Sequence, residues 1–108
     1  KECKMRDYIE NADFEETGFS YTLSLISGKY KMIILYCLME YQPAAALSGE
    51  DLDKTLSQNL KELEKDELIH REAYPQIPPK VEYSLTERGK SLMVVLDQLC
   101  IWGTENRK

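Results

Sequence analysis

The sequence predicts a mainly α-helical fold with one small β-hairpin, and three observations lead to that prediction. Apolar side chains recur at helical spacing in residues 29–41 and again in residues 54–65. Residues 87–102 carry apolar side chains on two sides of one further helix. Before that helix, two segments of alternating apolar and polar residues flank a stretch that holds three of the four prolines. A chain of 108 residues fits one domain, so we expect a polar arm over residues 1–18 and a domain over residues 19–108.

The composition is typical of a globular protein in water, with 31% charged and 43% hydrophobic residues. No apolar run approaches the roughly 18 residues that span a bilayer, and the polar start resembles neither a secretory signal nor an anchor. Three cysteines without a CxxC spacing and a single histidine argue against a zinc site or a disulfide framework. We therefore expect no metal, no cofactor and a cytoplasmic location.

The first core helix is expected over residues 29–41, after a short apolar segment that Gly28 closes and before Pro43. Its predicted buried face consists of Ile33, Ile34, Cys37, Leu38 and Tyr41. On this face Cys37 is expected to be a core thiol. Beyond Pro43, the sequence "AAALSGEDLDK" suggests a stunted helix, a turn at Gly49 and a new helix cap at Asp51 or Asp53.

Residues 54–65 form the clearest amphipathic helix of the chain. Its predicted buried stripe is Leu56, Leu60 and Leu63, whereas Lys54, Ser57, Gln58, Lys61 and Lys65 point outward. Two helices joined by a short turn that contains glycine, the second with exposed basic and amide groups, give the outline of a helix-turn-helix. An exposed face of this composition is also common on helices that only meet solvent.

The hairpin follows this helix directly. The segments "LIHREAY" and "KVEYSL" read as strands, and Val81, Tyr83 and Leu85 alternate toward one side. The linking "PQIPP" is too long for a two-residue turn, and its prolines keep it extended. A hairpin placed after an exposed helix is the layout of a winged helix-turn-helix, and we call the hairpin of residues 69–85 the wing.

The last helix predicts a homodimer. Thr86 is expected to cap it, with Glu87 in its first turn. Because the helix is apolar on two sides, one small domain does not cover it, and the second side calls for another copy of the chain. The residues expected to supply the interface and its adjoining core are Leu92, Met93, Leu96, Leu99, Cys100 and Trp102.

The run from Ser27 to Trp102 resembles the HxlR-type winged helix-turn-helix regulators, which are related to the MarR group. The resemblance is carried by "LISGKYKMIIL", by "KTLSQNLKELEKDELIHREAYPQIPPKVEYSLTERGKSL" and by "LDQLCIW", and the "PPKVEYSLT" block is its most specific part. It implies a dimeric transcriptional regulator of double-stranded DNA, with the second helix in the major groove and the wing on the minor groove or backbone. The positions that it implies for DNA binding are Lys54, Thr55, Gln58, Asn59 and Lys61 on the helix, with Arg71, Gln76 and Lys80 on the wing.

The sequence departs from the family in two places. Residues 44–53 are about five residues short of the usual stretch before the recognition helix, and they hold three alanines where larger side chains are expected. The chain therefore has either an incomplete reading motif or residues missing at this point, and we expect residues 44–53 to be irregular. Several family members sense oxidants or electrophiles through an N-terminal cysteine, which leaves a small-molecule or oxidant inducer open. Cys3 is the candidate redox sensor, but it lies further upstream than in the family and is favoured as an inert thiol.

An enzyme is not expected. Gly28 and Lys29 resemble the end of a phosphate-binding loop, but Tyr30 stands where that loop requires Ser or Thr. The stronger alternative is a winged-helix module for protein–protein contact. It is favoured by the net charge of −5, all of which arises in residues 1–53.

Overall fold

The computed structural model describes residues 4–47 and 53–108. In order, its elements are α1 (Lys4–Asn11), the 3-10 turn η1 (Phe14–Glu16), α2 (Gly18–Ile26), α3 (Lys29–Glu40), β1 (Ala45–Leu47), α4 (Lys54–Lys65), β2 (Ile69–Tyr74), β3 (Lys80–Leu85) and α5 (Glu87–Asn106). The strands form an antiparallel sheet in the order β1-β3-β2. The predicted class, mainly helical with a wing, is confirmed.

Strand β1 corrects the expectation for the segment after Pro43. Ala45 pairs with Tyr83, Ala46 with Glu82 and Leu47 with Val81, where we expected a stunted helix and irregular chain. Ala45 and Leu47 are half-buried against the core while Ala46 is exposed. Pairing with the edge of β3 thus overrides the helical preference of alanine. The turn at Gly49 and the alternative cap at Asp51 lie outside the described residues.

The core lies where α3, α4 and α5 meet the sheet. Its five most completely buried side chains come from all of these parts, namely Leu35, Leu63, Leu68, Ile69 and Met93. The predicted buried positions on α4 and β3 are confirmed, since Leu60, Leu63, Tyr83 and Leu85 are buried and Leu56 and Val81 pack partly against them.

Helix α3 is rotated relative to the predicted face. Ile34 and Leu38 are buried as expected, together with Leu35 and the unexpected Lys31. The prediction that Ile33, Cys37 and Tyr41 are buried was wrong, because all three side chains are exposed. The reason is that α3 packs on both α4 and α5, so its buried side is set by two neighbours.

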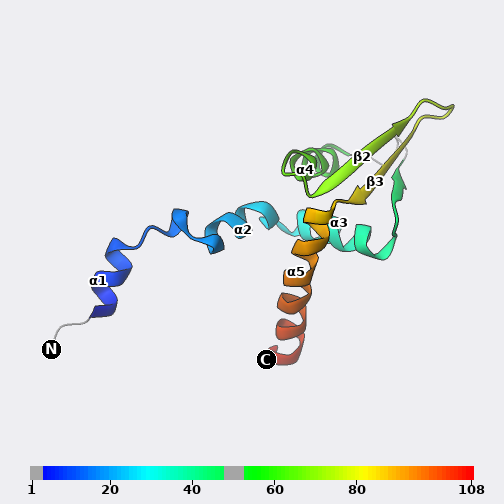
Figure 1. Ribbon diagram of the computed structural model, residues 1–108. Coiled ribbons are helices and arrows are strands. Elements are labelled where there is room, and N and C mark those ends of the chain that lie inside the picture. The colour runs from blue at the N-terminus through cyan, green and yellow to red at the C-terminus, as the bar shows by residue number, and fades with distance from the viewer. Residues whose placement is uncertain (1–3, 48–52) are drawn as a thin grey trace.

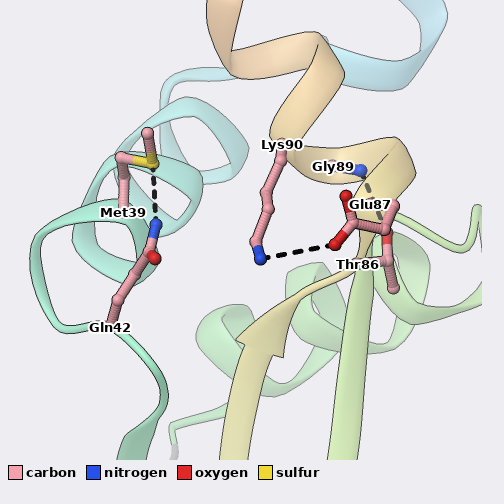
Figure 2. A network of polar contacts seen from close by, with 6 residues as sticks. All are labelled: Met39, Gln42, Thr86, Glu87, Gly89 and Lys90. Carbon is pink, nitrogen blue, oxygen red and sulfur yellow. Dashed lines mark hydrogen bonds and ion pairs between the residues drawn. The ribbon is translucent and has the colours of Figure 1, made fainter.

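Two caps fix the ends of α4 and α5. Asp53 accepts a hydrogen bond from the Leu56 amide at 2.7 Å, and Thr86 accepts one from the Gly89 amide at 2.9 Å. Figure 2 shows the cap of α5, with Lys90 reaching back to Glu87 at 3.5 Å. The Thr86 hydroxyl also donates to the Glu67 carbonyl at 2.7 Å, which joins the start of α5 to the turn between α4 and β2.

The N-terminal arm stands apart from this core. Figure 1 shows α1 far from the sheet, with α2 leading from it toward α3, and the molecule measures 73 × 29 × 25 Å. Helix α1 buries none of its residues, and Met5, Tyr8 and Ile9 are all exposed.

Candidate nucleic-acid interface

The candidate reading face lies on α4, which the Asp53 cap starts and the leucine stripe holds against α3 and the sheet. Lys54 and Thr55 are exposed in its first turn, and Gln58 is exposed one turn later. Asn59 is half-buried, and its side-chain amide donates to the Thr55 carbonyl at 2.8 Å. The structure thus places four of the expected residues along the first two turns of one helix, with Asn59 turned toward its own backbone.

The second part of the candidate interface joins α4 to the wing. A hollow of about 270 Å³ is lined by Ser57, Lys61, Glu64, Arg71 and Tyr83. It brings the cationic groups of Lys61 on α4 and Arg71 on β2 to one surface, although they are ten positions apart in the chain. Both residues are exposed. The hollow thus gathers two cationic side chains and the carboxylate of Glu64 between α4 and the wing.

Gln76 and Lys80 lie at the far end of the wing, where both line a hollow of about 230 Å³ with Pro78 and Pro79. Lys80 is less free than expected from the sequence, since its ammonium lies 3.2 Å from Glu82 and 5.5 Å from the centre of the Tyr74 ring. Hydrogen bonds from Tyr74 and then Lys80 lower the pKa of Glu82, and the bond to Glu82 raises the pKa of Tyr74.

Two features of this surface were not predicted. Ile77 is fully exposed at the wing tip. Its place in the proline-rich segment could have indicated this exposure from the sequence. Lys31 on α3 is buried and forms an ion pair with Glu62 of α4, with 2.9 Å between Nζ and Oε1. Glu62 also accepts a hydrogen bond from Gln58 at 3.0 Å. These bonds, from Lys31 first and then Gln58, hold the pKa of the Glu62 carboxyl below its usual value.

The residues expected at a dimer interface separate into two groups. Leu92, Met93 and Leu96 are buried in the core of the single chain, so they are not available to an exposed interface. Leu99, Cys100 and Trp102 are exposed further along α5. Beside them lies an apolar hollow of about 480 Å³, formed mainly by Phe19, Leu23 and Ile26 of α2 with Val95 and Leu99 of α5.

The two cysteines in the described part of the chain are not paired with each other. Cys37 and Cys100 are exposed free thiols, and Cys3 lies outside the described residues. Across residues 4–47 and 53–108, no group of three or more His, Cys, Asp or Glu side chains is arranged to hold a metal ion. In the same residues no single helix is long and apolar enough to cross a membrane, and α2 and α3 reach that length only together, with a bend of 78°.

Comparison with known proteins agrees with this geometry. The profile of the HxlR-like helix-turn-helix family matches residues 25–108. The HTH-type transcriptional regulator BH0655 of Halalkalibacterium halodurans is 50% identical over 100 residues, which cover 88% of each chain. The HTH-type transcriptional regulator YdzF of Bacillus subtilis is 47% identical over 94 residues, which cover 82% of this chain and 86% of YdzF.

Solved structures agree with the sequence comparisons. The redox regulator HypR in its reduced form has a TM-score of 0.72 at 36% identity, covering 85% of this chain and 95% of HypR. The HTH-type transcriptional regulator YtcD has a TM-score of 0.69 at 37% identity, covering 82% of this chain and 95% of YtcD.

The fold and the exposed face of α4 define a winged helix-turn-helix protein. The chain belongs to the HxlR-like helix-turn-helix family. It is a transcriptional regulator, not an enzyme, and its helix-turn-helix domain implies DNA binding.

Proposed function

We propose that this regulator binds a specific double-stranded DNA sequence as a homodimer, with α4 in the major groove and the wing along the DNA backbone. One observation supports this best: Gln58 is exposed on α4 between Lys54 and Lys61, and the Lys61–Arg71 hollow continues the cationic surface onto the wing. A side-chain amide suits the edge of a base, whereas ammonium and guanidinium groups suit phosphates.

In this arrangement the N-terminal end of α4 enters the groove first. Gln58 and Asn59 face adenine, whose N6 and N7 offer a donor and an acceptor to one amide. Lys54 and Lys61 hold phosphates, and Thr55 adds a hydroxyl at the same end of the helix. Asn59 contributes less than Gln58, because one of its N–H groups already donates to the Thr55 carbonyl.

The wing contacts the backbone through Arg71 at its base and through Gln76 and Lys80 near its tip. The prolines at positions 75, 78 and 79 restrict the linking segment before DNA arrives, so contact costs little further conformational entropy. This accounts for the unusual proline content of the tip.

The homodimer is supported by the apolar surface that one protomer leaves uncovered. The α2–α5 hollow and the exposed Leu99, Cys100 and Trp102 are continuous through α5, and α1 buries no residue in its own protomer. We assign this surface to a second copy, with Leu92, Met93 and Leu96 beneath it. A two-fold dimer binds a pseudo-palindrome whose half-sites lie about 34 Å apart or a multiple of that. BH0655 and YdzF are bacterial proteins, and on that basis we place this regulator in a bacterial cytoplasm.

The wild-type protein is first used to select its preferred sites from random DNA duplexes. The affinity for a selected site is then measured over a range of salt concentrations, which tests this proposal. Gln58→Ala is expected to weaken the selected site by about 1–3 kcal/mol and to relax preference at one base pair. Arg71→Ala is expected to weaken every sequence alike and to reduce the slope of log K against log salt by about one.

Two results would contradict the proposal. Unchanged affinity and salt slope in both variants would mean that this is not the DNA face, and the stiff wing would then serve a protein partner. If light scattering shows a stable monomer at micromolar concentration, the proposed homodimer is wrong.

A further inference from the structure

The carboxylate of Glu62 connects the buried interior to the candidate reading face. Its Oε1 atom lies 2.9 Å from the Lys31 ammonium, and its Oε2 atom accepts the hydrogen bond from Gln58 Nε2 at 3.0 Å. The Lys31 side chain is only 9% exposed, whereas that of Glu62 is 43% exposed. One carboxylate therefore faces a buried cation on α3 with one oxygen and the exposed amide of Gln58 with the other.

This contact determines which end of the Gln58 amide is free. A side-chain amide has a donor end, its NH₂ group, and an acceptor end, its carbonyl oxygen. An ionised carboxylate only accepts hydrogen bonds, so the NH₂ end of Gln58 turns toward Glu62 and the carbonyl oxygen turns away. The buried ammonium of Lys31 keeps Glu62 ionised, because a neutral Glu62 would leave a buried cation without its partner.

We propose that Lys31 and Glu62 are positioning residues that set the base preference of Gln58 to adenine. This inference rests on the proposed function. The free carbonyl oxygen of Gln58 accepts from the adenine N6 amino group, and the remaining N–H donates to adenine N7. Guanine presents O6 and thymine O4, which are acceptors and meet the Gln58 oxygen unfavourably. Cytosine has an amino group at N4 but no counterpart of adenine N7 on the same base, so it cannot match both ends of the amide as adenine does.

A comparison of Gln58 with Asn59 shows what the Lys31–Glu62 ion pair contributes to the orientation of Gln58. The Asn59 amide donates to the Thr55 carbonyl of its own helix, at 2.8 Å, so its orientation depends on α4 alone. Gln58 is oriented through Glu62 by a residue of α3, so its base preference depends on how α3 and α4 are packed.

The first experiment uses the unaltered protein and altered DNA. The base pair that faces Gln58 is the one whose preference is lost in Gln58→Ala. At that pair, replacing adenine with purine removes the N6 amino group and keeps N7. We expect this replacement, like replacement of the pair by G·C, to weaken binding about fivefold or more. Equal binding of the adenine and purine duplexes would overturn the inference, because Gln58 would then not offer its oxygen.

The second experiment alters the pair itself. In the double variant Lys31→Met/Glu62→Gln, the charges are removed together, so that no buried ammonium is left unpaired. The amide introduced at position 62 can form a hydrogen bond with either the NH₂ group or the carbonyl oxygen of Gln58. We therefore expect the preference for adenine over guanine to fall to about twofold or less, from about fivefold or more in the wild-type protein. Glu64→Gln is the matched control. It makes a carboxylate neutral on the same helix without a bond to Gln58, and should retain the adenine preference even if overall affinity rises.

The outcomes separate this inference from the proposed function. If the double variant keeps the full adenine preference while Gln58→Ala loses it, the inference is wrong and the proposed function stands. If the wild-type protein binds no duplex in a salt-dependent way, the proposed function fails and the inference fails with it. If the double variant does not fold, Glu62→Gln alone repeats the test, and an adenine preference that stays at its full value in that folded variant overturns the inference.

Discussion

The two halves of α5 are both rich in apolar side chains but have very different surroundings. In the first half, Met93 is completely buried, Leu96 is 2% exposed and Gly89 packs against the backbone of Leu68. In the second half, Leu99 is 57% exposed and Trp102 is 68% exposed. Both halves are rich in apolar side chains at helical spacing, so hydrophobicity alone does not distinguish them.

The difference teaches that the apolar content of a helix does not by itself say which of its side chains its own chain buries. One side of the first half of α5 is buried by α3, the sheet and the turn before β2, while Val94 and Val95 on its other side are exposed. The second half meets only the apolar hollow of α2, and much of its surface stays uncovered. A helix with an uncovered apolar side of this size is typical of an interface, which is why we assign it to a second copy.

The largest expected effect comes from truncating one side chain in each half. Met93→Ala should lower the free energy of unfolding by about 2–5 kcal/mol, because it leaves a cavity in a closed core. This loss should be the same at every protein concentration in urea unfolding followed by circular dichroism. Trp102→Ala should instead destabilise through the dimer, so its cost should change with protein concentration. A cost for Trp102→Ala that does not depend on concentration would break the comparison.

Smaller changes in stability are expected from replacing the two glycines of α5 with alanine, and the two changes should have opposite signs. A Cβ atom at Gly89 would lie 2.1 Å from the Leu68 carbonyl oxygen, whereas one at Gly103 meets no atom within 4 Å. Gly89→Ala should therefore cost about 1–3 kcal/mol by forcing α5 away from the turn before β2. Gly103→Ala should raise helix stability by about 0.5–1 kcal/mol, because alanine loses less backbone entropy than glycine. Thermal unfolding of both variants checks the signs, and equal shifts would show that the close contact at Gly89 does not matter.

Local pattern was sufficient for most of the fold. The period of 3.6 in residues 54–65 and the period of two in residues 80–85 identified α4 and β3. The cap at Thr86 was correctly predicted from residue type, and Asp53 was one of the two predicted caps of α4. These features depend on neighbours within a few positions in the chain, which is the range that sequence periodicity reports.

The features that local pattern missed depend on distant parts of the chain. Strand β1 forms because β3 offers a free edge to residues 45–47, and nothing in two alanines and a leucine indicates that edge. Lys31 is buried because Glu62 lies opposite it on another helix. The split of α5 into a covered and an uncovered half also depends on which elements reach it. The candidate DNA residues were located by resemblance, while the bonds of Gln58 and Lys80 required coordinates.

The smallest expected effect lies at the boundary between the two halves of α5. The Tyr36 hydroxyl on α3 donates to the Leu96 carbonyl at 3.2 Å, at the last buried turn of α5. Burial above all, with the Cys100 thiol and the Asp97 carboxylate nearby, raises the pKa of Tyr36 to about 12 from its ordinary value of 10.0. The fold thus favours the neutral phenol, so the stabilisation is fully present below pH 10 and is lost as the pH rises from 10 toward 12.

Tyr36→Phe should cost about 0.5–1.5 kcal/mol near neutral pH, because it removes one hydrogen bond. Between pH 10 and 12 this tyrosine ionises in the unfolded chain but stays neutral in the folded protein, which stabilises the unfolded wild-type chain, so the free energies of unfolding of the two proteins should converge as the pH approaches 12. Urea unfolding at a series of alkaline pH values measures the gap, and Tyr41→Phe, at an exposed tyrosine just beyond α3, is the matched control. A gap that stays constant from neutral to alkaline pH would mean that Tyr36 ionises as freely in the folded protein as in the unfolded chain. The hydrogen bond to Leu96 would then contribute equally at every pH, and burial at this end of the covered half would not favour the neutral phenol.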